Sequence, residues 1–385
     1  MMTVKKNSSF FLSPVLACLC ILFFAAYAKA QNDSVLINTP PGKIIAARVM
    51  YGSIVVHSKY IRNTSGAHPR AGEIEISRQH FDSATWRKCY CFPRSGWQLH
   101  IADLDTKILG RSYSASYFIE PNYRLSNNAS VFIKGGLGIS YLTNPFDSTK
   151  NPENHTYSLP VNFFLHLGTG ISYNISKRIS IEGMIGFEHN SNGDFQQPNR
   201  GINWYAASLG IRYNTGSNTL PKYKRQIDKS WQKEKPFIEA GIFYSPKGGY
   251  DKYDRPERKF VAGAAVQVTK KVSIINAVSV AAEVYYDDAL ASAKRWYSDT
   301  SSSMFAGLLL GHEFIFRKFI FSQQLGVYVF KNTTTYSLLN QSPIQTLYHR
   351  WGLMYKVSPH WFAGINFLAH KQVADFVDAR LMYRI

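Results

Sequence analysis

Polar and apolar residues alternate with a period of two along much of this chain. Between positions 129 and 141 one face carries Val131, Ile133, Leu137, Ile139 and Tyr141, and the other carries Ser130, Lys134, Gly136, Gly138 and Ser140. Segments 161–174 and 377–385 repeat the alternation, and Phe132 and Phe164 are the exceptions, as apolar residues at polar positions. A period of two predicts β-strands with one apolar and one polar face. The sequence therefore predicts an all-β fold.

A soluble β-sandwich also alternates, so further features must separate it from a membrane barrel. The polar face is rich in glycine and small polar residues, and tyrosines lie near the expected strand ends, as in an interfacial girdle. The connections also alternate in length, as they do between the two sides of an outer-membrane barrel. Short turns are expected near 126–128, 175–178, 270–271, 317–318 and 357–359, and long polar loops near 143–158, 192–201, 247–258, 288–301 and 332–344. These features favour an antiparallel outer-membrane β-barrel fold of about sixteen strands.

A basic stretch at 217–235 interrupts the alternation. It is long for a periplasmic turn and marks a boundary between two halves of about eight strands each. We expect a first half over 31–216, a linker over 217–235, and a second half over 236–385 whose role is not indicated. Two small barrels in tandem and one larger barrel with a long internal turn both fit this pattern.

The first thirty residues resemble an export signal rather than part of the fold. Lys5 and Lys6 precede an apolar stretch, and Ala28-Lys29-Ala30 forms a small-x-small cleavage site before Gln31. An uncleaved membrane anchor is the alternative, and the abrupt polar run after Ala30 disfavours it. Cleavage would remove three lysines and no acidic residue, which lowers the formal charge from +19 to +16.

Composition narrows the class of protein further. Of 385 residues, 15% are aromatic and only 18% are charged, which excludes a disordered chain. The basic balance suits a phosphate-bearing partner such as lipopolysaccharide, and it also suits an anion-preferring pore. Beyond the signal only Cys89 and Cys91 remain. In an extended strand their Cα atoms would lie roughly 6.6 Å apart with parallel side chains, at the edge of what a bridge tolerates, so we expect no disulfide between them.

One strand of the predicted barrel contains two side chains suited to catalysis. In 179–193 the odd, lipid-facing positions run from Ile179 to Phe187 and then continue as His189 and Ser191. This strand leads from a short turn to a long loop, so the pair lies at its outer end. A histidine beside a serine hydroxyl can act as its general base for attack on an ester carbonyl. Asn203, on the same face of the next strand, is placed to orient the imidazole. Polar residues at a barrel rim are also ordinary girdle residues.

The sequences FEHNSNG at 187–193 and PNRGI at 198–202 resemble the signature of PagL-type outer-membrane lipid A deacylases. The resemblance covers roughly residues 45–216 and implies an eight-stranded barrel. It implies His189 as base and Ser191 as nucleophile, with an oxyanion site around Asn192, Gly193 and Asn199. Asn203 occupies the position at which that family has an acid. Residues 236–385 have no counterpart in the short family members.

We therefore expect an outer-membrane esterase that hydrolyses an acyl ester of lipid A. The alternative is a non-enzymatic barrel, either porin-like or structural. Because the sequence contains no zinc-ligand spacing, phosphate-cradling loop or nucleic-acid motif, we expect no metal, no cofactor and no nucleic-acid partner. The expected partners are lipopolysaccharide and outer-membrane lipid, and the sequence does not indicate an oligomeric state.

Overall fold

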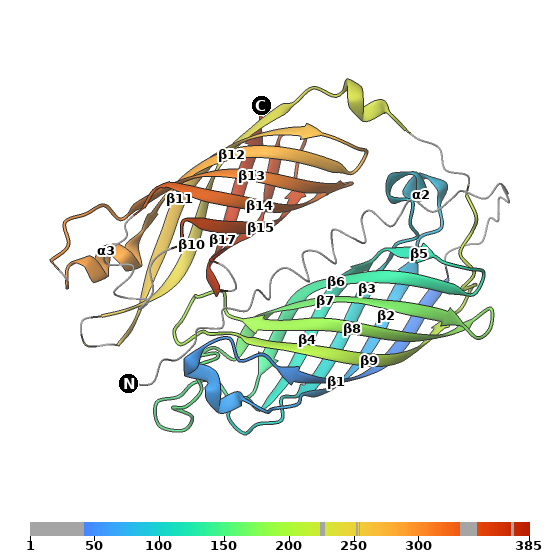
Figure 1. Cartoon of the computed structure of the whole chain (residues 1–385), viewed down its shortest axis with the longest axis horizontal. Helices are drawn as coiled ribbons and strands as arrows, with labels where there is room; N and C mark the ends of the chain where they lie inside the picture. The colour runs from blue at the N-terminus through green and yellow to red at the C-terminus, as the bar shows by residue number, and fades with distance from the viewer. Residues whose placement is uncertain are drawn as a thin grey trace, which may run out of the picture.

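The computed structural model describes residues 42–223, 228–251, 253, 255–296, 298–331, 345–370 and 373–385. The predicted signal at 1–30 lies outside this range. The described strands form two closed eight-stranded antiparallel barrels in sequence order (Figure 1). The all-β outer-membrane barrel fold predicted from the alternation is confirmed, and of the two arrangements left open the chain adopts the tandem one.

The first barrel comprises eight long strands and one short one. It closes through pairing of β4 with β6 and of β1 with β9. The strands are β1 (Lys43–Ile54), β2 (Arg70–Gln79), β3 (Arg94–Asp103), β4 (Arg111–Glu120), β5 (Asn122–Arg124), β6 (Ala129–Leu142), β7 (Val161–Asn174), β8 (Ile179–Ser191) and β9 (Ile202–Asn214). A 3₁₀ helix, η1 (Lys59–Thr64), follows β1, and α2 (Ser83–Cys89) follows β2.

The second barrel closes through pairing of β10 with β17. Its strands are β10 (Phe237–Tyr250), β11 (Pro256–Lys271), β12 (Asn276–Asp287), β13 (Met304–Phe316), β14 (Phe319–Phe330), β15 (Leu347–Lys356), β16 (Trp361–His370) and β17 (Val373–Arg384), with α3 (Asp288–Lys294) after β12. The loop expected at 247–258 is shorter than predicted, because β10 and β11 stay paired as far as Tyr250 and Pro256. The turn expected at 270–271 lies at 272–275, since β11 continues through Lys271.

The segment between the barrels runs from the end of β9 to the start of β10. It contains the 3₁₀ helix η2 (Ser230–Lys233). In the first barrel the odd residues of β8 face outward, with Ile181 and Ile185 48% and 67% exposed. This apolar outer surface matches the lipid-facing band of a membrane barrel. Within the described residues no helix combines the length and apolar character needed to cross a membrane.

Side chains fill the interior of the first barrel, as expected for eight strands. Arg48 lies 2.7 Å from Glu75 and 2.8 Å from Glu182, and Lys134 also contacts Glu75. The two exceptions to the alternation, Phe132 and Phe164, are fully buried in this interior. They interrupt the polar face because large side chains are needed to fill space between the ion pairs.

The second barrel has a similar interior. Arg350 is fully buried and bridges two acidic side chains, with Nε 3.1 Å from Glu283 and Nη1 2.5 Å from Asp378. Phe243, Tyr285 and other aromatic residues pack around this cluster. A buried charge is tolerated only when it is paired, so these ion pairs form the fixed interior of each barrel.

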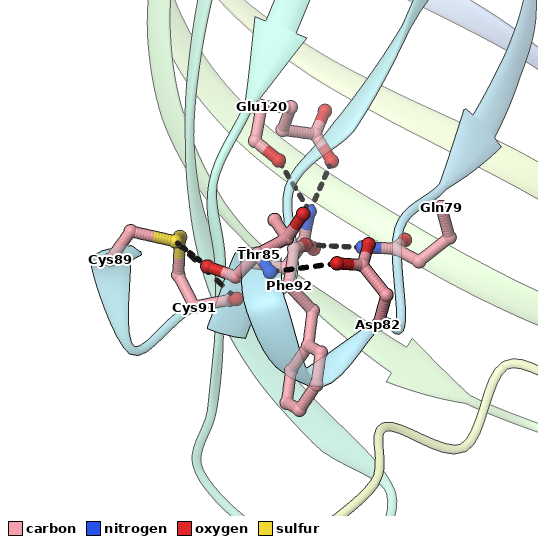
Figure 2. The surroundings of a disulfide bond; sticks show 8 residues. Gln79, Asp82, Thr85, Cys89, Cys91, Phe92 and Glu120 are labelled. Atoms are coloured by element: carbon pink, nitrogen blue, oxygen red, sulfur yellow. Dashed lines mark hydrogen bonds between the residues drawn. A yellow bond between two sulfur atoms is a disulfide. The ribbon is translucent and has the colours of Figure 1, made fainter. Parts of the chain in front are cut away.

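The structure corrects the expectation that Cys89 and Cys91 are not bridged. The two sulfurs form a disulfide at the end of α2 (Figure 2). The expectation assumed an extended strand, but Tyr90 between them has φ 51°, a left-handed conformation that ends the helix. This turn brings the Cα atoms to 5.1 Å, within the range a disulfide requires. At the other end of α2, Asp82 accepts a hydrogen bond from Thr85 N at 2.7 Å.

Candidate active site

His189 and Ser191 lie at the outer end of β8, on the wall rather than in the interior. Glu188, which precedes the pair, and Asn190, which lies between its two members, are buried inside the barrel. His189 is half-buried and Ser191 is 8% exposed. His189 Nε2 lies 2.9 Å from Ser191 Oγ. Residues two apart on a strand share one face, which brings the hydroxyl within hydrogen-bond distance of the imidazole.

Asn203 completes a chain of hydrogen bonds through this histidine. Strand β9 pairs with β8 in a register that sets Asn203 directly opposite His189. His189 Nδ1 lies 2.5 Å from Asn203 Oδ1. An amide oxygen only accepts, so Nδ1 carries the proton and Nε2 is left to accept the hydrogen of the Ser191 hydroxyl. The three residues singled out from the sequence are therefore in contact.

The loop between β8 and β9 contains the three residues predicted around an oxyanion. Asn192 N donates to Asn199 Oδ1 at 3.1 Å. The Asn192 side chain turns away into the loop, where Nδ2 donates to Gln196 O at 2.8 Å and to Ser158 Oγ at 3.2 Å. Asn192 therefore organises the loop with its own donors. Gly193 follows it with φ +69°, a conformation that favours glycine.

Backbone contacts hold the far end of this loop against the neighbouring one. Arg200 N donates to His155 O at 3.1 Å, and Gly201 N donates to Thr156 O at 2.7 Å. Gly201 has φ +73°, and a Cβ placed on it would lie 3.0 Å from His189 Cε1. The loop thus packs directly against the imidazole, and only glycine fits at this point.

One neighbour of the site was missed by the sequence analysis. His57 follows β1, with Nε2 2.7 Å from Arg200 O and Nδ1 3.2 Å from Asn203 Nδ2. No sequence signal marked it, because it stands in an irregular segment where alternation gives no orientation. It comes near Asn203 because Val55 N donates to Asn203 O at 2.8 Å.

The wall beside the site is apolar. Phe163 of β7 lies opposite Ser191 in the strand pairing and contacts Phe195 of the loop edge-on, at 5.8 Å between ring centroids. Further from the loop, Ile185 and Leu209 are 67% and 71% exposed. Such a surface can contact hydrocarbon along its length.

The loop also meets the second barrel. Gly248 N of β10 donates to Asp194 O at 2.5 Å. A Cβ placed on Gly193 would lie 3.0 Å from Val377 Cγ2 of β17. Burial, reinforced by the nearby Asp375 and Asp287 carboxylates and opposed by Lys247, raises the pKa of the Asp194 carboxyl well above its usual range. The second barrel thus forms part of the surroundings of the candidate site.

Within the described residues, no cluster of three or more histidine, cysteine, aspartate or glutamate side chains is suited to holding a metal ion. The His189 site is built from an imidazole, a hydroxyl and an amide. Its contacts are those of acid–base and nucleophilic chemistry.

Comparison with known proteins shows what the chain is similar to. No curated protein sequence matches the chain significantly. Among solved structures, neisserial surface protein A is 12% identical, with 45% of this chain and 96% of that chain covered at a TM-score of 0.32. The outer membrane enzyme PagL is 15% identical, with 43% and 97% covered at a TM-score of 0.30.

Family models give the more specific result. The model for lipid A 3-O-deacylase (PagL) matches residues 78–212, which include His189, Ser191 and Asn203. The model for the acyloxyacyl hydrolase C-terminal domain, PagL_C, matches residues 237–385, the whole second barrel. The resemblance stated for the first half is thereby confirmed and extended to the second. The chain therefore belongs to the PagL lipid A 3-O-deacylase family and is an outer-membrane lipid A hydrolase.

Proposed function

We propose that Ser191 is the nucleophile and His189 the general base in hydrolysis of an acyl ester of lipid A. The observation that carries this proposal is the 2.9 Å contact between His189 Nε2 and Ser191 Oγ on the outer wall. The hydroxyl proton passes to Nε2 as Oγ attacks the ester carbonyl, and Nε2 then protonates the leaving alcohol. Water then attacks the acyl-enzyme as His189 takes its proton, and His189 returns that proton to Ser191 Oγ as the acyl–Oγ bond breaks and the fatty acid leaves.

The tetrahedral intermediate needs hydrogen-bond donors for its oxyanion. Asn199 uses Oδ1 to accept from Asn192 N, which fixes the amide and leaves Nδ2 as its donor. We assign the oxyanion contacts to Asn199 Nδ2 and the Gly193 backbone N–H. Asn192 contributes indirectly, because its donors hold the loop in shape. Acyl chains would lie along the apolar wall near Phe163 and remain in the bilayer.

The first prediction tests the nucleophile and the base. In Ser191→Ala and His189→Ala, we expect lipid A deacylation to fall by at least about 10³-fold, because neither group can be replaced by the remaining one. Mass spectrometry of lipid A from cells that produce each variant measures the loss of the acyl chain. Ser53→Ala is the matched control, since Ser53 is an exposed serine of β1, two strands from β8, and pairs with Tyr205 of β9.

Equal acylation in wild type and Ser191→Ala would remove Ser191 from the mechanism. Ion conductance by the purified protein would then favour the porin-like alternative. The buried ion pairs around Arg48 and Arg350 argue against a conducting pore, because both guanidinium groups are enclosed by paired carboxylates.

A further inference from the structure

His57 occupies a fixed position on the far side of Asn203 from the proposed base. It lies in the segment between β1 and β2 and is half-buried. Its ring bridges that segment to the loop after β8 through Arg200 O. The Arg200 carbonyl is itself held, because Arg200 N donates to His155 O and the Arg200 guanidinium lies 5.0 Å from the centre of the Tyr60 ring.

The hydrogen bonds of His57 define its neutral tautomer. Arg200 O can only accept, so His57 Nε2, 2.7 Å away, carries the proton. In the neutral ring Nδ1 is then an acceptor, and Asn203 Nδ2 is a donor 3.2 Å from it. Val55 O, 3.1 Å from Nδ1, would be a partner only for the doubly protonated ring.

This contact determines which way the Asn203 amide points. With Nδ2 directed to His57, Oδ1 faces His189 Nδ1 and requires a proton there. The opposite orientation would present Nδ2 to His189 and move the proton to Nε2. That tautomer cannot accept from Ser191 Oγ, and the base would be lost. A carboxylate accepts at both oxygens and has no such ambiguity, so only an amide needs a partner that fixes its direction.

We propose that His57 is a positioning residue that orients the Asn203 amide and so keeps His189 in the tautomer that can accept the Ser191 proton. This inference rests on the proposed function, and it assigns to His57 and Asn203 together a task that one acidic residue performs alone. The chain of donors runs in one direction, from Ser191 through His189 and Asn203 to His57 and the Arg200 carbonyl.

The second prediction tests His57 with a double-mutant cycle. His57→Phe removes the acceptor, and we expect kcat for deacylation to fall about tenfold or more with little change in KM, because His57 contacts Asn203 and Arg200 rather than Ser191. His57→Gln keeps an acceptor for Asn203 and a donor for Arg200 O, so it should retain most of the activity. In an Asn203→Asp background, whose carboxylate has no donor end, His57→Phe should cost less than about threefold.

The outcomes separate the two proposals. An equal loss from His57→Phe in both backgrounds would mean that His57 only supports the loop, and wild-type kcat in His57→Phe would also overturn the inference. Ser191→Ala is measured alongside. If it stays active, the proposed function fails, whereas an inactive Ser191→Ala beside a fully active His57→Phe contradicts the His57 assignment alone. The circular dichroism β-signal of every variant reports whether it folds.

Discussion

At the scale of single residues, the distinctive feature of the site is an amide beside the imidazole. Asn203 Oδ1 accepts from His189 Nδ1 as a carboxylate would, but it carries no negative charge. It can therefore fix the tautomer of the ring while stabilising the imidazolium of the transition state less than an acid does. An acid at this position would both fix the tautomer and stabilise the imidazolium, so a separation of the two effects is expected in this chain, where Asn203 mainly fixes the tautomer.

The third prediction follows from that separation. Asn203→Ala leaves His189 without a partner on Nδ1, and we expect its deacylation rate to fall about tenfold or more. Asn203→Glu restores a charge at this position and should be as active as wild type or faster. Initial rates on purified lipid A measure both. Equal rates in all three proteins would show that Asn203 takes no part in the site.

The shared face of His189, Ser191 and Asn203 could be predicted from the sequence, because side chains in a strand alternate strictly and each strand's apolar residues mark its lipid face. The direction of the Asn203 amide could not. It depends on His57, which is 146 residues away and lies in a segment without periodicity. Only the folded arrangement of two loops brings these groups together.

At the scale of elements, the loop between β8 and β9 shapes the site. Gly193 and Gly201 both have positive φ and stand near its two ends. The loop turns sharply at each of them, and hydrogen bonds to the preceding loop hold it between. These contacts fix the course of the loop between Ser191 and Ile202 without any helix or strand to carry it.

The fourth prediction concerns Gly201. Gly201→Ala forces a left-handed conformation on an alanine, at about 1–2 kcal/mol, and its methyl group presses on the His189 ring. We expect a clear loss of kcat in a folded barrel. Gly72→Ala is the matched control, because a Cβ there meets no atom within 4 Å. Comparable rates for the two variants in the mass spectrometric assay would argue against a tight fit at Gly201.

Element-level expectations failed where the local backbone departs from a regular strand. The Cys89–Cys91 pair was expected to stay unbridged because a strand geometry was assumed, and the left-handed Tyr90 made the disulfide possible. Phe164 was an exception to the alternation whose reason lies in packing: its ring stacks on buried His100 at 5.4 Å. Neither the turn nor the packing partner is encoded in the period of the sequence.

At the scale of the whole molecule, the second barrel is a neighbour of the proposed site rather than a separate appendage. Asp194 and Gly193, in the loop between β8 and β9, lie against Gly248 and Val377 of the second barrel. The loop is therefore enclosed on one side by a barrel that contributes none of the proposed reacting groups. The loop and the second barrel are thus in direct contact.

The fifth prediction uses the raised pKa of Asp194. Asp194 has a higher pKa in the folded protein than in the unfolded chain. Such a carboxyl group destabilises the folded state as the pH rises from its unfolded-state pKa through its folded-state pKa. We therefore expect the loop of the wild type to become more susceptible to proteases, and deacylation to decline, as pH increases through this range. Asp194→Asn cannot ionise and should keep its loop protected. Identical pH profiles for the two proteins would contradict this account.

By itself the sequence determined the strands, their lipid-facing residues, the approximate strand number and the outer position of His189 and Ser191. These follow from the period of two and from the alternation of short and long connections, which are local properties. The tertiary structure alone decided that the strands close as two barrels, through the β1–β9 and β10–β17 pairings. It also decided which loops meet around Asn203. Strand pairing is made by backbone groups common to all residues except proline, so contacts between distant segments leave little trace in a single sequence.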